Sequence, residues 1–178
     1  MKTEEKSPVY SRDVMELITV VVEYCAYLEQ SEGKSREEFT DTILKILPLL
    51  YLKASLLPKY EILDFDYYAE DFVNEENYNI IRENIAVIMS DKDDYLDVFV
   101  EDMKYSDTPV LATVSENLAD MYQELKNFAL EYKTAVDEQL MMNALAQLKE
   151  NFQYDWGQKL VNVMRALHEV RYAEQDAF

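Results

Sequence analysis

Carboxylates are the side chains of this sequence with the most potential for chemistry, and one row of them repeats at helical spacing. Glu116, Asp120 and Glu124 stand four residues apart, so a helix would place all three on one face. Carboxylate oxygens are the ligands that hard divalent cations such as Mg²⁺ prefer. The row has the opposite helical phase to the apolar residues of the same segment. The spacing therefore suits a metal site, but the phase favours a row that faces away from the main core, towards solvent or a docked partner.

A second acidic run, from Asp91 to Asp102, partly resembles a calcium-binding loop. Asp91 and Asp93 occupy the first and third positions of such a loop. Leu96 stands at the sixth position, where the loop needs glycine, and Asp102 replaces the glutamate of the twelfth. We interpret the run as the start of a helix, because acidic residues favour helix N-termini.

A thiol nucleophile with an imidazole base is formally available, since the chain has one cysteine, Cys25, and one histidine, His168. Cys25 lies on the apolar face of a predicted helix, where a free thiol behaves as a small hydrophobic residue. His168 borders the core face of the last predicted helix. We expect structural roles for both residues.

The composition predicts an all-α fold. Only two glycines and four prolines occur among 178 residues, too few turn-forming residues for many short strands. A loop that binds phosphate through its backbone needs several clustered glycines, so binding through a P-loop or Rossmann turn is excluded. We predict no cofactor. The lone cysteine and the absence of an apolar N-terminal run favour a reduced, cytoplasmic protein.

The acidic charge is concentrated in one segment. The chain has a formal net charge of −19, and residues 61–107 contain 15 acidic residues against three basic ones. A field of this sign repels nucleic acid and anionic lipid and attracts basic proteins. No apolar run is long enough for a membrane span. We therefore expect neither nucleic-acid nor membrane binding.

Hydrophobic periodicity predicts a single-domain bundle of five or six helices. An acidic aromatic excursion, residues 60–74, separates the second helix from the third. Gly157 lies inside the last pattern, which suggests that another backbone passes close to it. The expected domain covers residues 11–172, between tails at 1–10 and 173–178. The predicted helices cover about 11–30, 35–57, 75–89, 115–132 and 137–172, the last as one helix or two. Ser35 is the expected cap of the second helix, and Thr113 or Ser115 starts the fourth.

Four motifs in combination resemble a bacterial family of small, acidic, all-helical proteins known as a domain of unknown function. They are LPLLYLKASLLP at 47–58, YLDVF at 95–99, SENLADMYQELKNF at 115–128 and F-x-x-x-W-G…ALH at 152–168. The resemblance covers most of the chain. It implies a self-standing cytoplasmic helical domain and brings no catalytic residue.

The stretch NLADMYQEL also resembles part of the MazG-type nucleotide pyrophosphohydrolases. These all-helical enzymes bind magnesium through E-x-x-E and E-x-x-D pairs on neighbouring helices. Asn117 stands where the pattern has glutamate before Asp120, and Glu38 with Asp41 is the nearest substitute for the other pair. This resemblance implies an alternative function, a Mg-dependent all-α nucleotide pyrophosphohydrolase-like enzyme.

We favour a non-enzymatic protein-interaction domain, monomeric or homodimeric, that meets a basic protein partner. Its docking surface would be the acidic, tyrosine-rich segment 60–107, since tyrosines are effective interface anchors. Neutralising its aspartates should weaken partner capture and leave folding intact. Mimicry of nucleic acid by surface acids is a third possibility. The candidate binding residues are Asp91, Asp93, Asp94, Asp97, Tyr67 and Tyr95.

Overall fold

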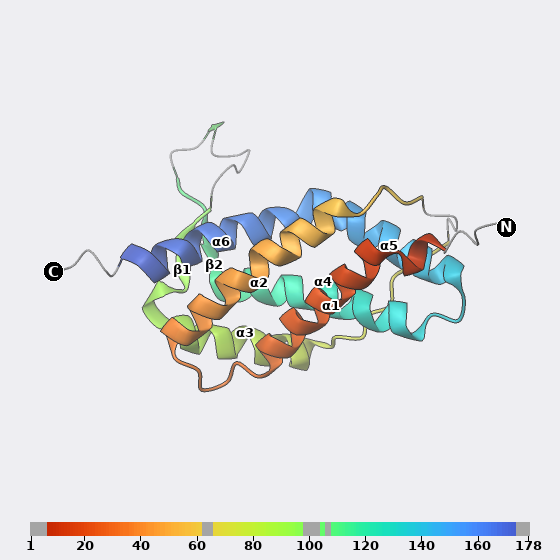
Figure 1. Cartoon of the computed structure of the whole chain (residues 1–178). Helices are drawn as coiled ribbons and strands as arrows, with labels where there is room; N and C mark the ends of the chain where they lie inside the picture. The colour runs from red at the N-terminus through yellow and green to blue at the C-terminus, as the bar shows by residue number, and fades with distance from the viewer. Residues whose placement is uncertain (1–6, 62–65, 98–103, 106–107, 174–178) are drawn as a thin grey trace.

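The computed structural model describes residues 7–61, 66–97, 104–105 and 108–173 (Figure 1). The described chain forms a helical bundle with one small antiparallel hairpin, so the prediction of an all-α bundle is confirmed. The predictions for residues 1–6 and 174–178 lie outside the described residues. The helices are α1 Arg12–Glu29, α2 Arg36–Leu56, α3 Glu75–Met89, α4 Val114–Thr134, α5 Glu138–Asn151 and α6 Gly157–Tyr172.

The helices begin where side-chain caps can bind their first free N–H groups. In five of the six, the residue before the helix accepts a hydrogen bond from the backbone N–H three residues on. Each such cap stabilises a helix by about 1 kcal/mol. The capping residues are Ser11, Ser35, Asn74, Thr113 and Asp137.

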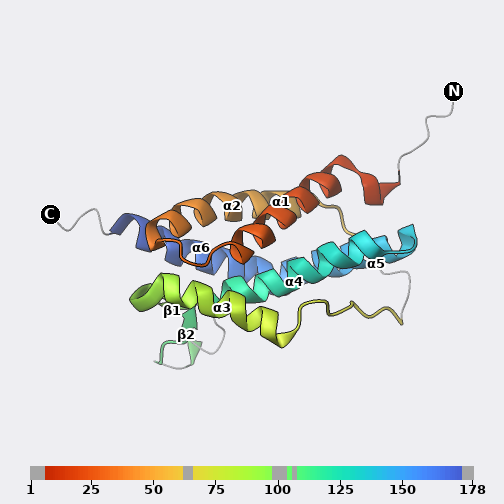
Figure 2. The ribbon, with the colours of Figure 1, turned by 90° about the horizontal axis from the view of Figure 1, so that it is seen from below.

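Helix α4 is central to the bundle, because it packs against α1, α3, α5 and α6. Figure 2 shows α1 and α2 along one side of the bundle and α3 along the opposite side. Fully buried aromatic residues, Trp156 and Tyr24 among them, fill the space between the layers. The Tyr24 hydroxyl donates a hydrogen bond to the Leu118 carbonyl oxygen at 2.8 Å, which joins α1 to α4. The chain also packs before α1, since Val9 in the turn Pro8–Tyr10 is fully buried.

The hairpin consists of β1, Asp94–Leu96, and β2, Leu111–Thr113, paired with Tyr95 opposite Ala112. Our prediction that a helix starts near Asp91 is therefore wrong. A short turn, Ser90–Lys92, follows α3, and the chain then becomes extended. The segment is a strand because it pairs with residues more than ten positions further along the chain. Hydrophobic periodicity within the segment cannot reveal such a partner.

The final predicted helix is continuous but contains one wide turn. Residues Phe152–Trp156 form a π-helical turn between α5 and α6. Gly157 ends this turn, and a Cβ atom there would lie 2.2 Å from the Phe152 carbonyl oxygen and 2.9 Å from the Phe152 ring. The expected close backbone is thus the same helix five residues earlier. It is not a separate element.

Candidate functional site

The carboxylate row of α4 is the first candidate site, and much of it is covered by other elements. The same face of α4 continues past Glu124 to Asn127 and Glu131, and we include both in the row. Helix α3, the acidic aromatic excursion and the end of α5 lie against this face, where each supplies hydrogen-bond partners to the row. The sequence-based expectation that the whole row faces away from the packed core is therefore wrong. Only Glu116, at the start of the row, is exposed.

Asp120 is held between two helices. The Tyr78 hydroxyl of α3 donates a hydrogen bond to Asp120 Oδ1 at 2.7 Å, and Lys159 Nζ of α6 lies 2.9 Å from Asp120 Oδ2. Lys159 also forms an ion pair with Asp155 at 3.0 Å. Burial and the hydrogen bond to Asp120 raise the pKa of Tyr78, which keeps its hydroxyl protonated as a donor. Asp120 therefore joins α3 and α6 to α4.

Glu124 lies one turn further along and is also engaged. Asn151 Nδ2, at the end of α5, donates a hydrogen bond to Glu124 Oε1 at 2.5 Å. Burial raises the pKa of the Glu124 carboxyl, since the low-dielectric surroundings disfavour the charged form. Among the described residues, no group of three or more histidine, cysteine, aspartate or glutamate side chains is placed to hold a metal ion. The three proposed metal ligands, Glu116, Asp120 and Glu124, therefore do not form such a group.

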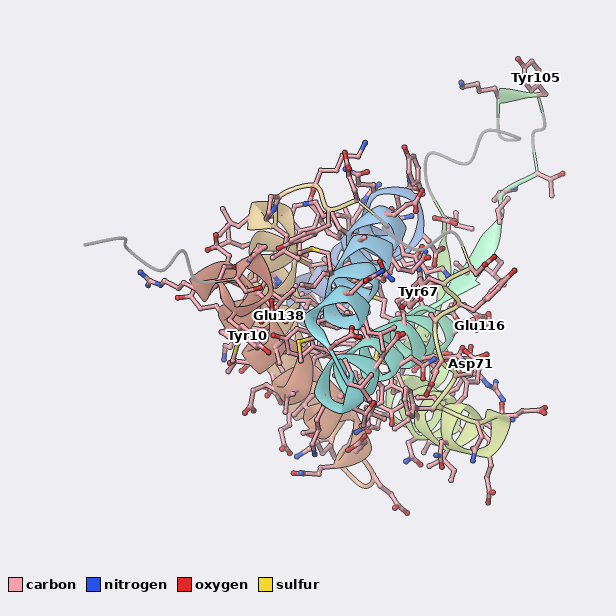
Figure 3. All side chains as sticks on the ribbon, turned by 90° about the vertical axis from the view of Figure 1, so that its right-hand side faces the viewer. Tyr10, Tyr67, Asp71, Tyr105, Glu116 and Glu138 are labelled. Carbon is pink, nitrogen blue, oxygen red and sulfur yellow. The ribbon has the colours of Figure 1, made fainter. Side chains whose placement is uncertain are left out.

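The excursion is attached to the remaining part of the row. Asn127 Oδ1 accepts hydrogen bonds from the backbone N–H groups of Phe72, at 2.9 Å, and Val73, at 2.8 Å. The Tyr67 hydroxyl donates to Glu131 Oε1 at 2.7 Å. Figure 3 shows Tyr67 on this segment beside α4. The polar face of α4 thus orders a segment that lacks regular secondary structure.

Glu131 gives the bundle a measurable pH dependence. Its side chain is buried, and this burial raises the pKa of the carboxyl above the usual 4.5. The folded state therefore holds this proton more tightly than the unfolded chain does. This group's contribution to stability consequently falls as pH rises from about 4.5 through the raised value.

We expect Glu131→Gln to stabilise the fold at neutral pH by about 0.5–1 kcal/mol, because glutamine still accepts the Tyr67 hydrogen bond without a buried charge. The gain should shrink as the pH approaches 4.5. Urea denaturation across this range measures both effects. Glu138→Gln, at an exposed position of α5, is the matched control. Equal gains for the two variants at every pH would contradict this account.

The four candidate aspartates have different surroundings. Asp91 is exposed and forms an ion pair with Arg36 at 2.8 Å, which lowers the pKa of the carboxyl. Asp97 Oδ1 accepts a hydrogen bond from Asn162 Nδ2 of α6 at 2.7 Å. Asp94 is exposed on β1. The structure therefore does not gather the four carboxylates into one free patch.

Asp93 serves the start of α4. Its Oδ1 accepts from the Ser115 backbone N–H at 2.8 Å, and its Oδ2 accepts from the Ser115 hydroxyl at 2.6 Å. Its carbonyl oxygen accepts from the Val114 N–H at 2.8 Å. We therefore no longer expect neutralisation of Asp93 to leave folding intact.

We predict that Asp93→Ala lowers the free energy of unfolding by about 1–2 kcal/mol, because two first-turn groups of α4 lose their acceptor. Asp94→Ala, one residue on and exposed, should change it by less than about 0.5 kcal/mol. Thermal denaturation monitored by circular dichroism compares the pair. The cap role would be ruled out by equal melting temperatures.

The tyrosines that face solvent are not the predicted ones. Tyr67 and Tyr95 are half-buried, and each hydroxyl is hydrogen-bonded, to Glu131 and to the Asn117 side-chain amide. Tyr68 and Tyr105 are instead 86% and 88% exposed. Figure 3 shows Tyr105 far out on the hairpin extension. Consecutive residues of an extended chain point to opposite sides, and this rule could have identified Tyr68 beside Tyr67.

Tyr95 and Asp97 do line an open cavity of about 640 Å³ between β1 and α6. Burial raises the pKa of Tyr95 to about 12, so its hydroxyl is neutral. Lys92 and Arg165 contribute positive charge to the same cavity, and acidic side chains offset it. The lining has no strong charge of either sign.

Helix α3 carries a continuous part of the exposed surface of the acidic segment. Four of its residues project from one outward face, because their spacings of three and four residues follow the helical repeat. Two are glutamates, and two are aliphatic residues with 49% and 79% of their surface exposed. We name this set the α3 outer stripe: Glu76, Ile80, Glu83 and Val87.

Cys25 and His168 are not paired for catalysis. Cys25 is 2% exposed in the core, and burial raises the pKa of its thiol to about 12. His168 is exposed on α6, where its ring lies 4.7 Å from the ring of Tyr172. A protonated, enclosed thiol is a poor nucleophile, so the expected core role of Cys25 is confirmed.

The fold and these surfaces define a helical-bundle domain of the all-α class. A family model described as a domain of unknown function, DUF5063, matches residues 8–173, and the chain belongs to this family. The chain is also similar to the crystal structure of protein BF1032 from Bacteroides fragilis. The two share 44% sequence identity with a TM-score of 0.80, over 93% of this chain and 99% of that one. No curated protein matches the sequence. The resemblance inferred from the four motifs is therefore confirmed.

None of the described helices combines the length and the hydropathy that are needed to cross a bilayer.

Proposed function

We propose that this domain is a protein-interaction module that binds a basic, amphipathic segment of a partner along the α3 outer stripe. The proposal locates the docking surface more narrowly than residues 60–107. It includes a reducing, cytoplasmic setting, in which the unpaired Cys25 is at no risk of disulfide formation.

The observation that carries the proposal is the exposure of Ile80 and Val87, which alternate with Glu76 and Glu83 along one face of α3. Aliphatic side chains in such a position cost solvation free energy, which docking of an apolar partner surface would recover. The flanking glutamates select lysine and arginine on that partner.

A synthetic amphipathic helical peptide, with leucines on one face and lysines on the other, is a suitable probe. Its binding can be followed by fluorescence anisotropy. We expect binding that weakens as salt rises, because the attraction is screened. The variant Glu76→Gln with Glu83→Gln and Val87→Ser should bind at least about 10-fold more weakly.

The matched control replaces two exposed glutamates of α5, Glu138→Gln with Glu150→Gln. It removes the same charge from another helix and should leave the affinity within about twofold. Equal losses in the two variants would show that the peptide responds only to net charge. The proposed docking face would then be wrong.

The magnesium-dependent alternative receives no comparable support, since Lys159 already neutralises Asp120 at 2.9 Å. We expect millimolar Mg²⁺ to leave the melting temperature unchanged to within about 1 °C, because a ligand that does not bind the folded state cannot stabilise it. Differential scanning calorimetry with and without MgCl₂ measures this. A clear rise specific to Mg²⁺, lost in Asp120→Asn, would revive the alternative.

A further inference from the structure

Helix α2 has an apolar face that no described element covers. Leu49, Leu52 and Leu56 follow one another at helical spacing, and each is between 43% and 50% exposed. Lys45 and Pro48 extend the same face towards the N-terminal half of the helix and are exposed as well. Large aliphatic side chains gathered in this way are unusual on a monomer surface and mark an interaction site.

A neighbouring pocket widens this face. Tyr51 of α2 forms one wall, and Phe152, Gly157 and Val161, from the π-turn and α6, form another part of a cavity of about 510 Å³. Tyr51 and Val161 are themselves 42% and 44% exposed. The pocket lies between α2 and α6, and the amide side chains of Gln153, Gln158 and Asn162 line it together with these apolar residues.

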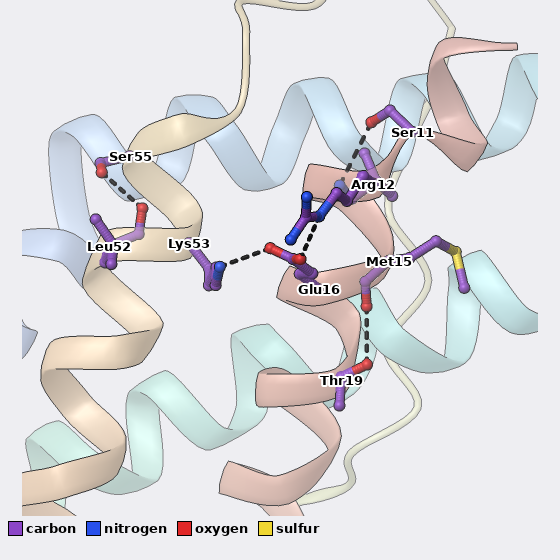
Figure 4. Close-up of polar contacts among 9 residues, drawn as sticks. Ser11, Arg12, Met15, Glu16, Thr19, Leu52, Lys53 and Ser55 are labelled. Atoms are coloured by element: carbon purple, nitrogen blue, oxygen red, sulfur yellow. Dashed lines mark hydrogen bonds and ion pairs between the residues drawn. The ribbon is translucent and has the colours of Figure 1, made fainter. Parts of the chain in front are cut away.

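The charge of this surface differs from that of the rest of the chain. Residues 42–60 and 156–168, which supply α2 and α6 here, contain no aspartate or glutamate, although the chain has 36 acidic residues. The lysines of α2 are largely neutralised at short range. Lys53 Nζ lies 2.6 Å from Glu16 of α1, as Figure 4 shows beside Leu52, and Lys45 Nζ lies 2.6 Å from Asp41.

Helix α3, which carries much of the acidic segment, lies on the other side of the bundle, and Asp97 of that segment reaches Asn162 of α6 at the border of the pocket. Figure 2 shows α3 and the hairpin opposite α1 and α2. Two copies that met through α2 would therefore keep their most negative surfaces apart. Any contact through α3 would bring these surfaces together, at a high electrostatic cost.

We propose that the α2 face, Leu49, Leu52 and Leu56 with Tyr51 and Val161, is the interface of a symmetric dimer of this chain. A twofold contact places the same patch on both sides, which suits an apolar surface whose flanking charges are already paired. The dimer would present two α3 outer stripes outwards. The inference stands independently of the proposed function, because it concerns the opposite surface and has the opposite response to salt.

Sedimentation equilibrium of the full chain, over rising protein concentration at low and high NaCl, tests the proposal. We expect the mass to rise from 21.0 kDa towards twice that value. Association should strengthen with salt, because each copy carries a net charge of −19. Leu52→Asp should weaken it by about 100-fold or more, since a carboxylate is then placed in both halves of the interface.

Val87→Asp on α3 is the control, because it adds the same charge at a position 79% exposed on the opposite side. It should change the dissociation constant by less than about threefold. If Leu52→Asp does not fold, the double variant Leu52→Ser with Leu56→Ser tests the apolar contact without adding charge. Circular dichroism verifies the folding of each variant. A chain that stays at 21.0 kDa at every concentration and salt, or equal weakening by Leu52→Asp and Val87→Asp, would overturn the proposal.

Discussion

Replacement of Gly157 by alanine is expected to lower the free energy of unfolding by about 2–3 kcal/mol. At an ordinary helix position the same change would raise it by about 1 kcal/mol, since alanine is the better helix former. The π-turn reverses the sign, because a Cβ atom would lie 2.2 Å from the Phe152 carbonyl oxygen. That oxygen belongs to the backbone and cannot move without displacing the turn. Thermal denaturation should show a melting temperature lower by about 4–10 °C.

Gly33→Ala provides the comparison. Gly33 has a φ of 77°, but no heavy atom lies within 4 Å of the place that a Cβ atom would take, so only backbone strain opposes a side chain there. This strain costs about 1–2 kcal/mol. The two substitutions thus distinguish two causes of destabilisation: a steric clash at position 157 and an unfavourable backbone conformation at position 33. An alanine at position 157 that stabilised the protein would show that the wide turn adapts to an ordinary helix.

Asn127→Leu is expected to cost about 2–3 kcal/mol, although the two side chains have similar volumes. Asn127 Oδ1 accepts from two backbone N–H groups, those of Phe72 and Val73, and leucine leaves both without that acceptor. The excursion should also open more often. Urea denaturation measures the first effect, and hydrogen exchange at Phe72 and Val73 measures the second.

The same substitution at Asn77, Asn77→Leu, controls for composition, because Asn77 is exposed on α3. We expect a change of less than about 0.5 kcal/mol there. If Asn127→Leu were equally mild and exchange at the excursion unchanged, the amide bridge would not be what orders this segment.

Much of the fold could be predicted because its signals are local. Caps such as Ser35 and Thr113 lie beside the helices that they begin, and the apolar repeat of each helix lies within it. The predicted helix limits differ from the observed ones by only a few residues. Cys25 could be placed in the core from the same repeat, since its neighbours at helical spacing are apolar.

The errors concern contacts between distant segments. The strand at Asp94–Leu96 depends on Leu111–Thr113, and the role of Asp93 depends on Ser115. The sequence does not distinguish the aspartates of the run from Asp91 to Asp97 from one another. Their partners, Arg36 and Asn162 among them, come from three different helices, and only folding brings those partners near.

The sequence by itself determined the helical class, the positions of the helices and the concentration of negative charge between residues 61 and 107. The tertiary structure decided which of those charges face solvent. Helical phase separates a core side from a polar side only for a helix with neighbours on one side. Helix α4 is surrounded, so α3 and the excursion cover its polar row and convert Asp120 and Glu131 into structural acceptors. Helix α3 has neighbours on its inner side, so its outer stripe keeps Glu76 and Glu83 in solvent.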